Sequence, residues 1–174
     1  MSKKITIHSQ LEKVKSDIYW TFRVPIDRDD IEEIYRQKNL RLNVMLQDQE
    51  SFNCALFHDG SGNFFININK QVRKKLDLEP GDKVKLIIER DDSEFGMPVP
   101  DVLKELMEQD PEGNEVFRSL TPGKLRSLIF MIAKPKSEQL KLIKALVIFD
   151  YLKESGGELD YKELMEAFKN NRYK

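Results

Sequence analysis

Residues 64–92, FFININKQVRKKLDLEPGDKVKLIIERDD, carry the pattern of a strand, a short helix, a turn and a second strand. Apolar residues alternate over residues 64–68 at the two-residue period of a strand. Val72 and Leu76 then stand four apart with basic residues between them, which predicts a short amphipathic helix. A Pro-Gly pair ends that helix before alternation resumes at residues 84–88. So much regular structure in so short a stretch indicates a small β-barrel.

The same alternation predicts four further strands, at residues 5–7, 20–24, 40–46 and 52–56. A second short helix is expected between the second and third of these, where Ile31, Ile34 and Tyr35 fall on one helical face. Together these segments predict a six-stranded small β-barrel with two short helices over residues 1–94. The order strand–helix–strand occurs twice in this half, which is explained either by an internal duplication or by chance similarity.

Helical spacing replaces alternation in the second half, and residues 95–174 predict a bundle of four to five helices. Thr121 before Pro122 is a well-specified helix start, because a capping residue precedes a proline at the first helical position. Residues 145–149, ALVIF, are apolar on every side of a long helix. That helix is expected to be either the hub of the bundle or half of a dimer interface. The predicted fold class is therefore α+β.

The charges of the chain nearly cancel, since 29 Lys and Arg oppose 30 Asp and Glu. No overall field favours nucleic acid or membranes, so an electrostatic partner would have to be bound by a local cluster. Cys54 is the only cysteine, which excludes an intramolecular disulfide. Residues 1–20 form no continuous apolar run, and the longest apolar run is far shorter than the roughly 20 residues that span a membrane. We therefore expect a cytoplasmic protein without a signal peptide or a membrane span.

Nucleophilic chemistry and soft-metal binding have only three candidate side chains, His8, His58 and Cys54, and these form no motif. Cys54 lies on an apolar strand face with Phe52 and Leu56, so a buried structural thiol is expected rather than a nucleophile. His58 could orient a ligand, but it stands at the mouth of a predicted hairpin, where a solvated histidine is the simpler interpretation. We expect no enzymatic activity, no cofactor and no metal site.

Two clusters of basic residues are the candidates for a ligand- or partner-binding site. The first lies on the predicted helix of the barrel and consists of Lys70, Arg73, Lys74 and Lys75. The second lies in the helical half and consists of Arg118, Lys124, Arg126, Lys134, Lys136 and Lys141. Either cluster could hold phosphates or another anionic surface, and either could be an ordinary solvated helix surface. Tyr19 and Trp20 could supply a stacking platform near the first cluster, or belong to the core.

Three segments of the first half resemble a small uncharacterised β-barrel domain that often precedes a YdeI/OmpD-associated domain. They are WTFRVP at residues 20–25, NKQVRKKL at residues 69–76 and GDKV at residues 81–84. Three segments of the second half resemble the YdeI/OmpD-associated domain itself: VPDVLKEL at residues 99–106, FRSLTP at residues 117–122 and IAK at residues 132–134. The presence of both sets of segments in this order is more specific for the family than either set alone. A helix followed by Pro-Gly-Asp, for example, also occurs in unrelated swapped-hairpin regulators.

The resemblance implies a bacterial protein with a non-enzymatic role associated with bacteriocin protection, outer-membrane porins or stress responses. The family usually carries a threonine-arginine stretch after the Ala-Lys pair, where this chain has SEQLK at residues 137–141. Because lysine supplies only a point charge, bidentate recognition of a carboxylate or phosphate by a guanidinium is weakened here.

Our leading hypothesis is therefore an uncharacterised binding module without catalysis. It would contact an unknown protein or peptide partner in stress, bacteriocin or antimicrobial-peptide protection. The alternative is a nucleic-acid-binding transcriptional regulator that uses a swapped-hairpin-like barrel and its basic helix. The sequence is compatible with both a monomer and a homodimer.

Overall fold

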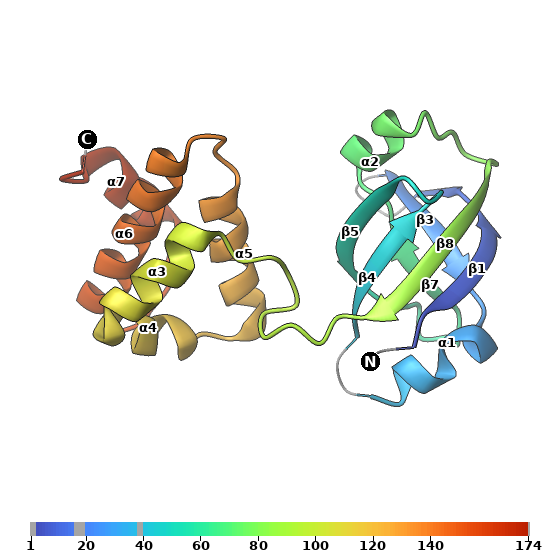
Figure 1. Cartoon of the computed structure of the whole chain (residues 1–174), viewed down its shortest axis with the longest axis horizontal. Helices are drawn as coiled ribbons and strands as arrows, with labels where there is room; N and C mark the ends of the chain where they lie inside the picture. The colour runs from blue at the N-terminus through green and yellow to red at the C-terminus, as the bar shows by residue number, and fades with distance from the viewer. Residues whose placement is uncertain (1–2, 16–19, 38–39, 174) are drawn as a thin grey trace. The chain divides into compact units, whose positions relative to one another are not determined.

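The computed structural model describes residues 3–15, 20–37 and 40–173, and it divides the chain into two compact units (Figure 1). The strand unit is Met1–Gly96 and the helical unit is Met97–Lys174. Antiparallel strands and two helices form the first unit, and five helices form the second. The predicted α+β class is confirmed.

The strand unit contains eight strands among its described residues. They are β1 (Ile5–Gln10), β2 (Glu12–Lys15), β3 (Trp20–Ile26), β4 (Arg41–Leu46), β5 (Glu50–Ala55), β6 (Phe57–His58), β7 (Phe64–Asn67) and β8 (Lys83–Arg90). One sheet has the order β1-β8-β4-β5 and the other has the order β2-β3-β7-β6. Every neighbouring pair is antiparallel.

These two sheets correct the expectation of one closed barrel of six strands. The first and fourth predicted strands each continue through a buried leucine into the other sheet, because Leu11 separates β1 from β2 and Leu56 separates β5 from β6. Backbone hydrogen bonds hold both bends: Leu11 N–H donates to the carbonyl of Asp82 at 2.9 Å, and Leu56 N–H donates to that of Leu40 at 2.8 Å. Strands that switch sheets in this way form the corners between two packed sheets.

The strand unit has a two-fold topological repeat. Its first half runs β1-β2-β3-α1-β4 with α1 at Arg28–Tyr35, and its second half runs β5-β6-β7-α2-β8 with α2 at Lys70–Lys75. Exchanging each strand for its counterpart in the other half reproduces both sheet orders in reverse. The strand–helix–strand similarity in the sequence therefore corresponds to a repeat in the fold.

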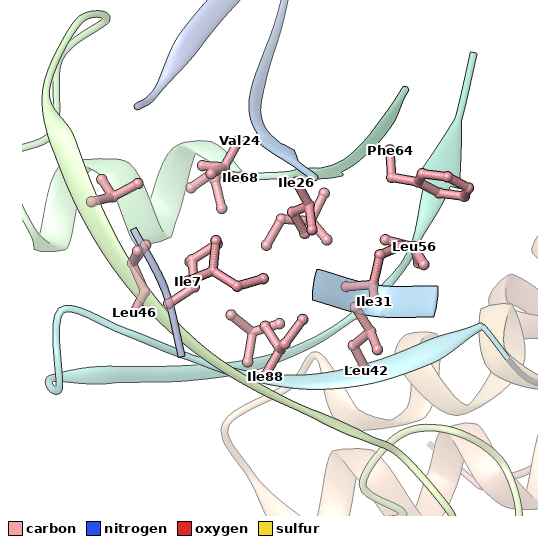
Figure 2. Packing of buried hydrophobic residues seen from close by; sticks show 14 of the residues in the cluster. Ile7, Val24, Ile26, Ile31, Leu42, Leu46, Leu56, Phe64, Ile68 and Ile88 are labelled. Atoms are coloured by element: carbon pink, nitrogen blue, oxygen red, sulfur yellow. The ribbon is translucent and has the colours of Figure 1, made fainter. Parts of the chain in front are cut away.

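Both sheets bury their inner faces in a single core. Figure 2 shows Ile7 and Ile88 from one sheet pointing into the same interior as Val24 and Ile26 from the other, beside Ile31 of α1. All five side chains are buried, as the alternation of apolar residues along their strands requires. Each buried aliphatic side chain of this size contributes about 1.5–3 kcal/mol relative to exposure, so the core dominates the stability of the unit.

One carboxylate is buried at the end of β8. Asp91 is 2% exposed and accepts hydrogen bonds from Asn53 Nδ2 at 2.8 Å, from Ser93 N–H at 3.0 Å and from Ser93 Oγ at 2.5 Å. The Asn53 amide also donates to Asn43 across the β4–β5 ladder. Asp91 thereby ties β5 to the segment that leaves the strand unit.

The helical unit is built around its longest helix. Its helices are α3 (Asp101–Gln109), α4 (Pro111–Arg118), α5 (Pro122–Ala133), α6 (Glu138–Glu154) and α7 (Tyr161–Asn170). α6 packs against the other four helices and buries side chains around its circumference, from Ala145 to Leu152. This position explains the apolar segment at residues 145–149, which belongs to the hub of the bundle. No helix among the residues that the structure describes is long and apolar enough to cross a membrane.

Asp110 links the start of α4 to α6. One carboxylate oxygen accepts the N–H of Gly113 at 2.9 Å, which caps α4, and the other accepts a hydrogen bond from Lys153 Nζ at 2.6 Å. The hydrogen bond from Lys153, followed by the bond from Gly113, lowers the pKa of Asp110 below its ordinary value. The charged carboxylate is therefore the form that stabilises the fold.

We expect Asp110→Ala to lower the free energy of unfolding at pH 7 by about 1–2 kcal/mol, because the cap of α4 is lost together with the ion pair. Since the folded pKa lies below the unfolded value of about 3.9, the part due to charge is present above pH 4 and disappears as the pH falls through the folded pKa. Urea unfolding from pH 7 to pH 2.5 measures it. Asp110→Asn is the matched control, because asparagine keeps the cap and removes the charge. A difference between wild type and Asp110→Asn that does not narrow toward low pH would contradict the role of the ion pair.

Candidate functional site

Two of the four basic residues predicted on α2 are engaged within the strand unit. The guanidinium of Arg73 lies 3.4 Å from the ring centroid of Phe22, and Lys75 Nζ forms an ion pair with Glu50 at 2.5 Å. Lys70 and Lys74 are exposed. Fewer of the cations of α2 are therefore available to a ligand than its sequence indicates. The role of α2 in binding stays a prediction. Tyr19 and the side chain of Trp20, the predicted stacking platform, lie outside the described residues.

The six basic residues of the helical unit are distributed over three helices and one loop. Arg118 Nε donates to Asn114 Oδ1 at 2.8 Å within α4, and Lys141 Nζ forms an ion pair with Glu138 at 2.5 Å within α6. Lys124 and Arg126 belong to the first turns of α5, whereas Lys134 and Lys136 follow its last residue. Ten residues of helix span about 15 Å, so Lys124 and Lys134 lie at opposite ends of α5. The six residues do not form one compact site, and their binding roles remain untested predictions.

The residues considered for catalysis lie on three different strands, His8 on β1, Cys54 on β5 and His58 on β6. Burial raises the pKa of the Cys54 thiol from 9.0 to about 12, against a smaller opposing influence of Arg41, so the nucleophilic thiolate is scarce near neutral pH. His58 lies in an aromatic cluster, with its ring 6.2 Å from that of Tyr35 and 6.0 Å from that of Phe64. His8 is exposed on β1. Within the described ranges, no group of three or more His, Cys, Asp or Glu side chains is arranged to hold a metal ion.

An apolar groove of about 790 Å³ is the most distinctive surface feature of the helical unit, and we call it the helical groove. α5, α6 and α7 form its walls, and its apolar side chains are Phe130, Met131, Leu140, Ile143, Met165 and Phe168. Three of these are strongly exposed: Phe130 by 60%, Leu140 by 52% and Met165 by 40%. Large apolar side chains that are exposed together in a concave surface are typical of a binding site.

Helical spacing explains why these side chains meet. Leu140 and Ile143 stand three apart on α6, as do Met165 and Phe168 on α7, so each pair lies on one face of its helix. α5 and α7 both pack against α6, and the groove follows α6 between them. The exposed side chains are therefore held by rigid helices and not by a loop.

The polar residues that line the helical groove are Lys134, Gln139, Lys144 and Asn171, and no carboxylate is among the described residues that line it. Lys144 Nζ donates to the carbonyl of Met131 at 3.2 Å and lies 5.6 Å from the ring centroid of Phe168. It thus joins α5 to α7 across the groove. Lys134 is exposed and forms no ion pair with another residue that the structure describes. The electrostatic character of the groove is positive.

Sequence reasoning named Lys134 as a candidate residue but did not predict the groove. Phe130 stands off the buried stripe of α5, so its position could have indicated an exposed aromatic residue. Met165 and Phe168 share helical spacing with Leu164, yet only Leu164 is fully buried. Nothing in the local sequence says that a neighbouring helix leaves Met165 uncovered.

Comparison with known proteins assigns both units. A family model described as domain of unknown function (DUF1905) matches residues 8–88, and one described as bacteriocin-protection, YdeI or OmpD-associated matches residues 96–154. The chain is a YdeI/OmpD-associated family protein with an N-terminal DUF1905 domain. A search of curated proteins found no match.

In this YdeI/OmpD-associated protein, the two matches follow the two units of the fold. The DUF1905 match extends from His8 in β1 to Ile88 in β8. The YdeI/OmpD-associated match ends at Glu154, the last residue of α6, so it includes two walls of the helical groove and not the third, α7. The groove therefore combines the family region with the C-terminal helix of this chain.

Proposed function

We propose that this protein is a non-enzymatic binding module in bacteriocin or antimicrobial-peptide protection, and that it holds a partner protein or peptide in the helical groove. The observation that carries the proposal is the exposure of Phe130, Leu140 and Met165 in one groove formed by three helices. Exposing such side chains to water is unfavourable, and a partner that covers them gains about 25 cal/mol for each Å² of apolar area removed from water. The family match at the helical unit supports the link to bacteriocin protection.

The environment of the candidate nucleophile supports a role without catalysis. The raised pKa of Cys54 leaves little thiolate, and Cys54 is partly buried in the strand unit against the core. His58 makes aromatic contacts with Tyr35 and Phe64 in place of a contact with a second catalytic group. Packing explains the position of Cys54, and exposed His58 is placed by its contacts with aromatic rings.

The nucleic-acid hypothesis gains no support from the basic residues. Contacts with phosphates require cations that are free to approach the backbone of the nucleic acid. On α2, Arg73 is stacked on Phe22 and Lys75 is paired with Glu50, so half of the predicted cluster is already engaged.

Complementation of a deletion strain tests the proposal. The strain should become more sensitive to bacteriocins or cationic antimicrobial peptides, and the wild-type gene should restore resistance. Leu140→Asp should fail to restore it, because a carboxylate in the groove opposes burial of an apolar partner. Leu142→Asp is the matched control: Leu142 is 39% exposed on the same helix but does not line the groove.

Immunoblotting and circular dichroism establish that both variants accumulate and fold. Full resistance with Leu140→Asp would show that protection does not depend on the groove. A deletion strain whose sensitivity to bacteriocins and antimicrobial peptides is unchanged would show that the protein has no protective role.

A further inference from the structure

The polar rim of the helical groove specifies the charge of its partner. Amphipathic helices commonly bind in apolar grooves of helical domains, with their apolar face inward and their polar flanks against the rim. Here the polar residues that line the groove are Lys134 and Lys144, together with the uncharged Gln139 and Asn171. A partner with acidic flanks would meet opposite charges, and one with basic flanks would meet like charges.

The acids nearest to the groove along α6 and α7 are already paired within the helical unit. Glu138 pairs with Lys141 at 2.5 Å, and Glu166 pairs with Lys169 at 2.6 Å. These pairs leave little net charge beside the groove. Lys136, which is exposed in the loop between α5 and α6, adds a further cation near Lys134.

From this charge pattern we infer that the helical groove binds an amphipathic helix whose apolar face is flanked by Glu or Asp. The inference rests on the proposed function in placing the partner in this groove. It goes further by naming the chemistry of that partner. A lysine-rich antimicrobial peptide has the opposite charge, so the groove contacts an acidic protein partner and does not capture the cationic peptide itself. Protection is then exerted through that partner.

A displayed peptide library tests the charge preference directly. Its members are helices of about five turns with one fixed face of Leu, Ile and Phe, and each flanking position is randomised between Glu and Lys. Selection on the full chain should enrich Glu over Lys at the flanks, with affinities of the purified Glu-flanked peptides about tenfold tighter than those of their Lys-flanked counterparts. Tenfold corresponds to about 1.4 kcal/mol. The preference should weaken at 1 M salt, where the Debye length is about 3 Å.

Charge reversal on the protein localises the effect. Lys134→Glu should remove the preference for Glu or reverse it, because the reversed charge lies on the rim. Lys124→Glu is the matched control, since Lys124 is exposed on the first turn of α5, about 15 Å from Lys134, which directly follows the other end of that helix. The Lys124→Glu variant should prefer Glu over Lys at the peptide flanks as strongly as the wild type does.

Several results would overturn the inference. Equal selection of Glu and Lys, with binding still lost in Leu140→Asp, would refute the acidic partner but leave the groove as a binding site. Absence of any selection would refute helix binding altogether. A homodimer in sedimentation equilibrium that dissociates in Leu140→Asp would show that a second copy of the chain occupies the groove. Loss of protection in Leu140→Asp is measured separately, so failure of the proposed function is distinguishable from failure of this inference.

Discussion

Phe149→Ala is expected to lower the free energy of unfolding of the helical unit by about 3–5 kcal/mol. Phe149 is almost fully buried in α6, and its ring centroid lies 5.4 Å from that of Phe117 in α4. The packing at this point is close, because a Cβ atom placed on Gly113 would lie 2.5 Å from Cδ2 of Phe149. A cavity in such a contact cannot be filled without moving α4 relative to α6. Urea unfolding followed by circular dichroism at 222 nm measures the loss.

Phe130→Ala is the matched control for that measurement. The substitution removes the same atoms, but Phe130 is on the surface of the groove, and we expect a change of less than about 1 kcal/mol. Similar losses in the two variants would show that the core of the helical unit is not centred on α6.

In the strand unit, Asp91→Ala is expected to reduce stability by about 2–3 kcal/mol. The substitution leaves the Asn53 amide and both donors of Ser93 without the acceptor that they now share. Groups that lose a hydrogen bond inside a protein retain the cost of their removal from water. Hydrogen exchange should become faster in β5 and β8, which this network joins.

Asp92→Ala serves as the comparison for Asp91→Ala. Asp92 is the adjacent carboxylate, pairs with Arg90 and is exposed. An exposed ion pair contributes little to stability because water and salt screen it, so this variant should unfold close to the wild type. Equal destabilisation by the two substitutions would mean that the contribution of Asp91 to stability does not depend on its burial.

Much of the fold follows from periodicity in the sequence. The alternation at residues 64–68 predicts β7, and the four-residue spacing of Val72 and Leu76 predicts α2. The continuous apolar segment at residues 145–149 predicts a helix surrounded by others, which is the position of α6. These patterns succeed because each reports on burial of one face of a local element.

The division into two sheets could not be predicted in the same way. Leu11 and Leu56 are buried like the inward residues of the strands before them, while the hydrogen-bonding partner changes from one sheet to the other, so neither leucine marks the corner in the sequence. β2 has a single apolar residue, Val14, and β6 has two residues in all, so neither gives a clear local signal. Pairing between strands depends on segments far apart in the chain, such as Ile5 and Ile88.

Of the candidate site, only charged residues could be predicted from the sequence. Lysines are recognisable in any sequence, and Lys134 proves to line the helical groove. The ion pair of Lys75 with Glu50 joins residues that are distant in sequence, so its effect on the basic cluster of α2 was not foreseeable. Exposure of Phe130 and Met165 likewise depends on how closely α5 and α7 approach each other over α6, which helical spacing does not determine.

The two-fold order of the strands determines how the strand unit must fold. Among the described strands, only the β2–β3 and β6–β7 pairings lie within one half, and the other four join one half to the other. A single hairpin is at best marginally stable in water, so neither half has a lasting structure of its own. Cleavage in the turn between β4 and β5 would yield two fragments, each the missing partner of the other. The strand unit is in this sense a symmetric dimer carried by one chain.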